Sequence, residues 1–212
     1  MDRLKAIFDA VIEGRAAEVE RGVIAALEAA VPAETILQDG MIAAMNEVGA
    51  RFEAQEFYVP EMLVAARAMQ SGLSILRPRL AAAGVKASGR VVLGTVKGDL
   101  HDIGKNLVGM MLEGAGFEIV DLGTDVPPAK FAEAARSNRA DLVCLSALLT
   151  TTMQNMRFTI EALEDLGIRD QVKVMVGGAP LTAEFAREIG ADGYGPDASS
   201  AVRLAKSLLG SN

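Results

Sequence analysis

Apolar residues recur at helical spacing from residue 2 to about residue 80, with no strand-like alternation between them. Two clear sets of such positions are Leu4, Ile7, Phe8, Val11 and Ile12, then Ile36, Leu37, Met41, Ile42 and Met45. Gly14, Pro32, the stretch 49–60 and Pro78 interrupt the pattern, so we expect about four helices, with Pro60 as the first residue of the fourth. The N-terminal part is therefore predicted to be a four-helix bundle.

A different pattern begins after Arg90, where short β-rich apolar runs alternate with helical patterns. The expected strands lie at residues 91–93, 117–120, 141–145 and 172–176, with a weaker one at 192–194. Strands that alternate with helices predict a parallel sheet covered on both faces, an α/β, doubly wound fold of the Rossmann or flavodoxin-like kind. In such sheets ligands bind beyond the carboxyl ends of the strands.

The stretch between the two patterns, Pro78–Gly89, is rich in small residues, and its second half is interpreted as a linker. A chain of 212 residues is long enough for two modest domains. We therefore expect a helical-bundle domain at residues 1–85 and an α/β domain at residues 89–212.

Composition narrows the class of function. The net charge of −7 argues against a nucleic-acid partner, because a phosphate backbone is bound by a basic surface. The one cysteine, Cys144, lies in an apolar run and cannot form an internal disulfide, which favours a reducing cytoplasm. No segment reaches the roughly 18 apolar residues that span a bilayer, and no export signal is visible, so no membrane partner is expected.

The only histidine, His101, stands in the segment GDLHDIGKN, residues 98–106, directly after the first strand expected in the α/β part. A phosphate-binding loop does not fit, because the two glycines are separated by five residues and Asn106 replaces the magnesium-binding Ser or Thr. Asp99 and Asp102 would also repel a phosphate. The dinucleotide fingerprint is missing from this turn as well, so nucleotide binding is not predicted here.

Other roles for His101 remain. General base catalysis oriented by Asp99 is chemically reasonable, but a nucleophile is missing, since Cys144 is expected inside a strand. A closed zinc site lacks ligands, whereas a single axial bond to a metal held in a macrocycle needs only one histidine. The remaining alternative is a loop histidine without chemistry, although the neighbouring carboxylate is the usual companion of a metal-bound imidazole.

Three motifs, in order, resemble the cobalamin-binding domains that hold their cofactor base-off and His-on. They are Asp99-Leu-His101-Asp-Ile-Gly104, Ser146-Ala-Leu148 and Gly177-Gly178. The 41 residues between the first and second motifs, and the 28 between the second and third, are spacings of that family. The resemblance implies that the cofactor is cobalamin and that His101 is the axial ligand to its cobalt.

The resemblance also implies a slot beside the sheet for the nucleotide tail of the cofactor. Ser146 would hydrogen-bond the tail base, and Leu148 and Thr150 would line the slot. Gly177 and Gly178 would let the backbone approach the tail closely. The implied cofactor-binding residues of the α/β part are Gly98, Asp99, Leu100, His101, Asp102, Ile103, Gly104, Ser146, Leu148, Thr150, Gly177, Gly178, Tyr194 and Ala198.

The family further implies a proton relay from His101 through Asp99 to Thr152. Methionine synthase has serine at the last of these positions, and Thr152 keeps the hydroxyl. The segment Ser146–Thr152, SALLTTT, is more similar to the corrinoid proteins of microbial methyl-transfer systems. Ordinary capping of the following helix is the alternative for Thr150 and Thr152.

Residues 41–69 resemble the helical cap that covers the methyl-bearing face of cobalamin in methionine synthase and in corrinoid methyl carriers. On this match Phe52 and Val59 would be the apolar residues of a cap that shields the methyl–cobalt bond from water. Packing in the core of the bundle is the alternative for both residues. The resemblance to cap and cofactor domain covers residues 2 to about 210.

The family implies a corrinoid methyl carrier. Its cobalt, as Co(I), would accept a methyl group from a substrate-specific methyltransferase. It would pass the group, as methyl-Co(III), to a methylcorrinoid:acceptor methyltransferase that serves tetrahydrofolate or a thiol. A reductive activation protein would be a third partner. Methylated amines are favoured as donors over a betaine, methanol or a methoxylated aromatic, on the resemblance of the segment Ser146–Thr152.

Two other functions stay as alternatives. The small subunit of a cobalamin-dependent mutase would share the α/β module, but it would not need the helical cap. A cobalamin sensor would join the cofactor to a DNA-binding or signalling module, yet the acidic chain shows no basic recognition helix.

Overall fold

A computed structural model describes residues 3–210, so the outermost residues of both expected domains, 1–2 and 211–212, lie outside the described part. The chain divides into two compact units. The first comprises the chain up to Ala87 together with Glu113–Gly116. The second comprises Ser88–Leu112 and the chain from Phe117 onward.

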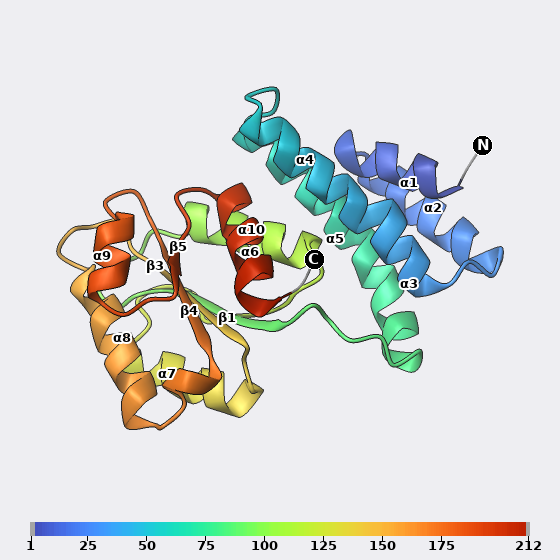
Figure 1. Cartoon of the computed structure of the whole chain (residues 1–212). Helices are drawn as coiled ribbons and strands as arrows, with labels where there is room; N and C mark the ends of the chain where they lie inside the picture. The colour runs from blue at the N-terminus through green and yellow to red at the C-terminus, as the bar shows by residue number, and fades with distance from the viewer. Residues whose placement is uncertain (1–2, 211–212) are drawn as a thin grey trace. The chain divides into compact units, whose positions relative to one another are not determined.

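The first unit is the expected four-helix bundle, coloured blue to green in Figure 1. Its helices are α1 (Arg3–Ile12), α2 (Ala16–Glu28), the run of α3 (Ala33–Thr35), the π-helical η1 (Ile36–Ile42) and α4 (Ala43–Glu53), and α5 (Val59–Ala82). Apolar side chains at the predicted helical spacing fill the bundle core, among them Ile7, Val11, Val19, Val23, Ile36, Met41, Val48, Met62, Met69 and Leu76. Pro60 is the second residue of α5, one position later than predicted.

Pro78 does not interrupt the last helix of this unit, so the expected break at this proline is wrong. α5 continues through Pro78 to Ala82. A proline inside a helix removes one N–H donor and crowds the carbonyl four residues earlier. Here the defect lies only about one turn from the helix end, and Leu76 and Leu80 on either side of it are buried. Packing of these two leucines stabilises the final turn against that defect.

The second unit contains a five-stranded parallel sheet with strand order β2-β1-β3-β4-β5. The strands are β1 (Arg90–Thr95), β2 (Glu118–Asp121), β3 (Leu142–Ser146), β4 (Lys173–Gly177) and β5 (Gly193–Tyr194). The intervening helices are α6 (Ile103–Gly114), α7 (Pro128–Asn138), α8 (Gln154–Asp165), the 3-10 turn η2 (Arg169–Gln171), α9 (Ala183–Glu188) and α10 (Ala198–Leu209). The predicted doubly wound α/β fold is confirmed.

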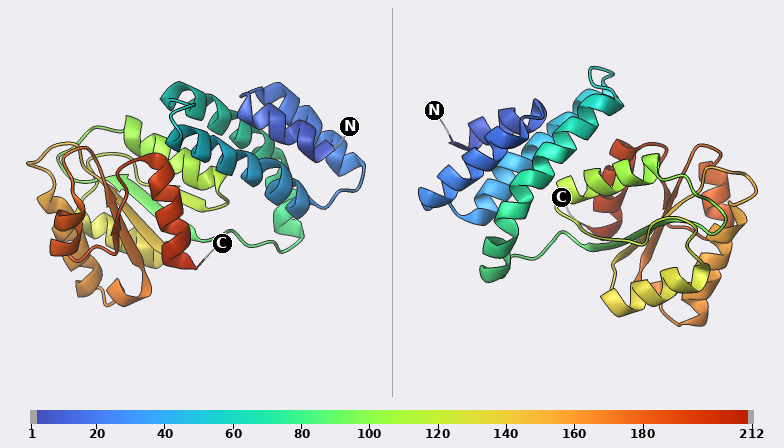
Figure 2. Two further views of the ribbon diagram at one scale, coloured as in Figure 1. Left: turned by 45° about the horizontal axis from the view of Figure 1, so that its top comes forward. Right: turned by 180° about the vertical axis from the view of Figure 1, so that it is seen from behind.

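Helices cover both faces of this sheet. Figure 2 shows α6 and α10 on one face and α7 and α8 on the other. Val92, Val143 and Val174 point into the core beneath α7 and α8, where Phe131 and Met156 are fully buried. Strands buried on both faces need continuous apolar runs, and the sequence of β3, LVCLS, is such a run. No helix in the described part of the chain has the length and apolar character required to cross a membrane.

Candidate functional site

The site is built on the loop between β1 and α6, at the carboxyl edge of the sheet. β1 pairs with β2 on one side and with β3 on the other, so this loop lies at the switch point where ligands of such sheets bind. Gly98 has a φ of 81°, a left-handed conformation that glycine adopts without steric cost. At the strand end, the hydroxyl of Thr95 donates to the carbonyl of His101 at 2.8 Å and fixes the far side of the loop.

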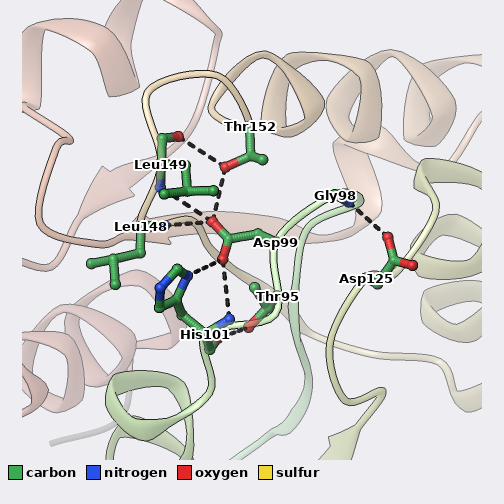
Figure 3. A network of polar contacts seen from close by, with 8 residues as sticks. All are labelled: Thr95, Gly98, Asp99, His101, Asp125, Leu148, Leu149 and Thr152. Atoms are coloured by element: carbon green, nitrogen blue, oxygen red, sulfur yellow. Dashed lines mark hydrogen bonds and ion pairs between the residues drawn. The ribbon is translucent and has the colours of Figure 1, made fainter.

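His101 is held by the buried carboxylate of Asp99 (Figure 3). The Nδ1 atom of the ring lies 2.6 Å from Oδ1, and the backbone N–H of His101 donates to the same oxygen at 3.1 Å. Asp99 is 0% exposed, whereas the His101 side chain is 50% exposed. A carboxylate bound to Nδ1 keeps the proton on that nitrogen, so Nε2 is the atom left to bind a metal.

The second oxygen of Asp99 is held by the loop that follows β3. Oδ2 accepts the backbone N–H groups of Leu148 at 2.8 Å and Leu149 at 3.2 Å, and the hydroxyl of Thr152 lies 2.9 Å away. Burial by itself raises the pKa of Asp99, but the hydrogen bonds from Leu148, His101 and Thr152 outweigh it and hold the pKa of this carboxyl well below its usual range. Asp99 is therefore an anion at neutral pH.

Thr152 is buried and completes the chain of contacts from His101. Its hydroxyl also lies 2.8 Å from the carbonyl of Leu149 and, having one proton, can donate to only one of its two acceptors at a time. α8 begins at Gln154 without a side-chain hydrogen bond at its cap, so neither Thr152 nor the exposed Thr150 caps this helix. The structure thus brings His101, Asp99 and Thr152 together in the predicted order.

Large apolar side chains stand exposed around the imidazole. Leu100 and Ile103 are 74% and 78% exposed, and Leu148 and Leu149 are each 41% exposed. Clusters of exposed apolar residues on a soluble surface mark places where another molecule binds. Figure 3 shows Leu148 beside the ring of His101. The loop of His101 and the loop after β3 thus carry four exposed apolar residues, which we call the apolar rim.

The residues fit a metal that arrives inside a planar organic ring. Among residues 3–210, no cluster of three or more His, Cys, Asp or Glu side chains could hold a metal ion, so the protein offers one nitrogen rather than a closed ligand set. A metal already held in a macrocycle would need only that nitrogen from the protein, and the exposed side chains of Leu100, Ile103 and Leu148 would offer the macrocycle apolar surface. Cobalt in a corrin meets both conditions.

Two residues predicted to hold the tail of the cofactor, Ser146 and Gly177, pair laterally in neighbouring strands. Thr95, which was not predicted, pairs with Ser146 on the other side, and the side chains of Thr95 and Ser146 share the face that α6 and α10 cover. The hydroxyl of Ser146 makes no hydrogen bond to any described residue. A Cβ atom added to Gly104, in the first turn of α6, would meet nothing within 4 Å. A free hydroxyl and open space therefore lie at the strand ends and at the start of α6.

The neighbours of Tyr194 and Gly178 within the protein are defined, and their contact with the tail stays a prediction. Tyr194 pairs with Val176 and packs against the core beneath α7 and α8, so its side chain lies on the opposite face from Ser146. Gly178 does allow a close approach, but the approaching group is the protein's own backbone. A Cβ atom there would lie 1.8 Å from the carbonyl oxygen of Ala147. Gly178 is required by the fold, and Ala198 is a buried residue of the first turn of α10.

The two apolar residues predicted for the cap are both at least partly exposed. Phe52, in α4, is half-buried, and Val59, the first residue of α5, is 40% exposed. The exposure of Val59 excludes core packing for that residue, and the cap role of both residues stays a prediction. Asp102 is exposed and accepts a side-chain bond from Asn106 at 3.1 Å, which stabilises the start of α6.

Three charged residues beside the loop were not predicted from the sequence. Lys105 is buried in the first turn of α6 and forms an ion pair with Asp121 at the end of β2. Asp125, in the loop after β2, accepts the backbone N–H of Gly98 at 2.7 Å. Both carboxylates follow a predicted strand at the ligand edge, and that position is the signal that could have found them.

Comparison with known proteins agrees with this geometry. Family models described as "B12 binding domain" match residues 89–203 and residues 3–77. The chain is 47% identical over 206 residues to dimethylamine corrinoid protein 3 of Methanosarcina acetivorans, covering 97% of this chain and 96% of that protein.

Solved structures give the same result. The methanol:cobalamin methyltransferase complex MtaBC of Methanosarcina barkeri matches with a TM-score of 0.88 at 28% identity, over 99% of this chain and 80% of the matched chain. A cobalamin-binding protein of Desulfitobacterium hafniense DCB-2 matches with a TM-score of 0.79 at 30% identity, over 97% of this chain and 98% of that one.

Proposed function

The chain belongs to the family defined by the B12 binding domain, and from this premise we propose that it is the methyl-carrying corrinoid protein of a methyltransferase system. Its cofactor is cobalamin. The observation that carries the proposal is the half-exposed imidazole of His101, locked through Nδ1 to a buried carboxylate beside the apolar rim. When bound, the cobalt of a reduced corrinoid supplies the chemistry, since it takes a methyl group from a donor and yields it to an acceptor.

The protein's residues orient the ligand and hold its proton. His101 would bind the metal through Nε2, because Nδ1 is occupied by Asp99. The low pKa of Asp99 keeps the proton on Nδ1 rather than on the carboxylate. The hydroxyl of Thr152 stabilises the charge on the far oxygen of Asp99. Leu100 and Ile103 would exclude water from the lower side of the ring.

Further residues are proposed to hold the nucleotide tail of the cofactor and to form the cap over it. Ser146, Gly177 and Thr150 would hold the nucleotide tail at the carboxyl edge, with the open space at Gly104 left for it. Residues 1–85 would act as a cap on the cofactor domain at 89–212. Phe52 and Val59 are the apolar cap residues that would shield the cofactor from water, and their partial exposure supports that role.

The names of similar proteins suggest a methyltransferase as the partner. One structural neighbour is part of a methanol:cobalamin methyltransferase complex, and similar sequences are named dimethylamine corrinoid proteins. We assign a methylated amine as the donor, delivered by a substrate-specific methyltransferase. A second methyltransferase for the acceptor and a reductive activation protein complete the proposed system, and the lone buried thiol of Cys144 supports a cytoplasmic location.

The test is a methyl-transfer assay with defined components. The protein is loaded with hydroxocobalamin, reduced chemically, and mixed with a dimethylamine-specific methyltransferase and dimethylamine, while the absorption change of cobalt methylation is followed. We expect methylation to depend on the protein, with free cobalamin and methanol as the controls. An absence of methylation with dimethylamine, monomethylamine and trimethylamine, each with its matching methyltransferase, would contradict the proposal.

A further inference from the structure

Asp125 holds the backbone of the His101 loop at Gly98 (Figure 3). Its Oδ1 atom accepts the backbone N–H of Gly98 at 2.7 Å, and its own N–H donates to the carbonyl of Asp99 at 3.0 Å. These two hydrogen bonds bracket the residues Gly98 and Asp99. The backbone that carries the buried carboxylate is therefore clasped by one residue of the loop after β2.

The loop that carries Asp125 is itself bound to the end of β1. Thr95 receives Val126 N–H on its carbonyl at 3.0 Å and donates its own N–H to the carbonyl of Gly123 at 2.9 Å. Val96 and Val126 continue this pairing as a parallel bridge. Hydrogen bonds on both sides of Asp125 thus tie its loop to the end of β1, and the position of Asp125 is set by the sheet itself.

Asp125 holds a backbone conformation that most residues avoid. Its φ of 53° lies in the left-handed region, which is unfavourable for an L-residue and which Asp and Asn tolerate better than most. Residues kept in this region against their preference cluster at functional sites. The side chain of Asp125 is exposed, so the bond to Gly98, rather than packing, is what it contributes.

Asp99 is consequently positioned from two directions. Leu148, Leu149 and Thr152 hold its carboxylate, and Asp125 holds its backbone. The bond from Asp99 to Nδ1 of His101 is short, at 2.6 Å, and such a bond weakens when either partner shifts by a few tenths of an ångström.

We propose that Asp125 is a positioning residue that sets how firmly His101 binds cobalt, acting through the backbone of Gly98 and Asp99. This inference rests on the proposed function, because it takes His101 as the axial ligand. The hydrogen bonds of Asp125 to this loop go to the backbone of Gly98 and Asp99, and not to the imidazole of His101. Groups that orient a metal ligand without binding the metal tune its affinity. Removing such a group typically weakens metal binding about tenfold or more.

Three substitutions separate the contributions of Asp125. Asp125→Gly removes the acceptor and tolerates a positive φ, so it isolates the side-chain hydrogen bond. Asp125→Asn keeps an acceptor oxygen and the tolerance of the left-handed region but removes the charge. Asp125→Ala removes the acceptor and also suffers the backbone strain.

The matched control is Asp141→Ala. The Oδ2 atom of Asp141 accepts the backbone N–H of Arg90 at 2.7 Å, which is the same kind of bond at the same distance. It lies at the opposite end of β1 from the His101 loop. Losing this hydrogen bond should lower the stability of the α/β unit without changing how His101 binds cobalt.

The readout is the visible spectrum of each protein loaded with methylcobalamin, resolved into His-on and base-off fractions. A second readout is amide hydrogen exchange at Gly98 in the cobalamin-free protein. We expect Asp125→Gly and Asp125→Ala to lower the His-on to base-off ratio about threefold to tenfold and to speed exchange at Gly98, with Asp125→Asn and Asp141→Ala close to wild type.

A wild-type His-on ratio in Asp125→Gly would overturn this inference and leave the proposed function intact. An equal loss in Asp141→Ala would also overturn it, because the effect would then follow stability rather than position. A wild-type protein that binds methylcobalamin base-off would overturn the proposed function and this inference together.

Discussion

The Nδ1 atom of His101 lies 2.6 Å from Oδ1 of Asp99, and Asp99 in turn is completely buried. The other carboxylate oxygen accepts bonds from the loop after β3, so the direction of the imidazole is determined by two loops that follow different strands. A ligand held in this way before the metal arrives loses little freedom on binding. The strength of this pair is therefore the first property to test.

Asp99→Asn should destabilise the protein without cobalamin by about 2–4 kcal/mol. Hydrogen-bond donors face both oxygens of Asp99, from His101 on one side and from Leu148, Leu149 and Thr152 on the other. An amide group must turn its NH₂ toward one of these sets, which leaves buried donors facing each other. Urea unfolding followed by circular dichroism measures the loss, and an unchanged midpoint would show that these bonds contribute nothing to stability.

Acid should weaken the wild-type protein more than Asp99→Asn. The folded-state pKa of Asp99 lies below its unfolded value of about 3.9, so its contribution is complete above that pH and is lost as the pH falls toward the folded pKa. The difference in free energy of unfolding between the two proteins should therefore shrink from pH 7 to pH 3. Urea titrations across this range check the prediction, and a constant difference would contradict it.

Thr152→Val should lower stability by about 1 kcal/mol, whereas Thr152→Ser should be close to wild type. Valine keeps the shape of threonine and removes the hydroxyl that lies 2.9 Å from Asp99 and 2.8 Å from the carbonyl of Leu149. In the cobalamin-loaded protein, valine should also reduce the His-on fraction, since the carboxylate loses one of its donors. Equal behaviour of the two variants in both assays would exclude Thr152 from the relay.

Gly104→Ala should weaken cobalamin binding, whereas Gly178→Ala should destabilise the fold. A Cβ atom at Gly104 meets nothing, and alanine is the better helix former, so the fold should be as stable as wild type or up to about 1 kcal/mol more stable. If the cofactor tail fills that space, cobalamin affinity should fall by about tenfold or more. Wild-type affinity in Gly104→Ala would place the tail elsewhere.

Gly178→Ala, in contrast, should damage the fold itself. Its φ is 137°, and the new Cβ atom would lie 1.8 Å from the carbonyl oxygen of Ala147. We expect a loss of about 3 kcal/mol or more in the protein without cobalamin, measured by urea unfolding. A stable Gly178→Ala protein with weakened cobalamin binding would instead assign this glycine to the cofactor.

The spacing of apolar residues along the chain was enough to predict most of the fold. Buried strands such as Leu142–Ser146 are nearly continuous apolar runs, and the bundle helices repeat apolar residues at helical spacing, so each element is specified by its own sequence. Pro78 was misjudged because a proline signals a helix end locally, while the packing of Leu76 and Leu80 is a tertiary effect. The π-helical turn at Ile36–Ile42 likewise leaves no mark in the apolar spacing.

The site was predictable where a motif or a strand end marked it. The contacts among His101, Asp99 and Thr152 follow from two loops that meet at the same sheet edge. The face on which Tyr194 lies could not be predicted, because the face of a residue in a two-residue strand depends on register with β4. Asp125 follows a predicted strand at the ligand edge, but its hydrogen bond goes to the backbone N–H of Gly98, a partner that no side-chain motif marks.

The measurement that tests the central claim most directly is the visible absorption spectrum of the cobalamin-loaded protein, wild type beside His101→Ala. The wild type should bind cobalamin in a one-to-one ratio with a His-on spectrum, and His101→Ala should bind it with a base-off spectrum. Asp141→Ala, which loses a bond at the far end of β1, should keep the wild-type spectrum. A His101→Ala spectrum identical to wild type would contradict the assignment of His101 as the ligand to cobalt.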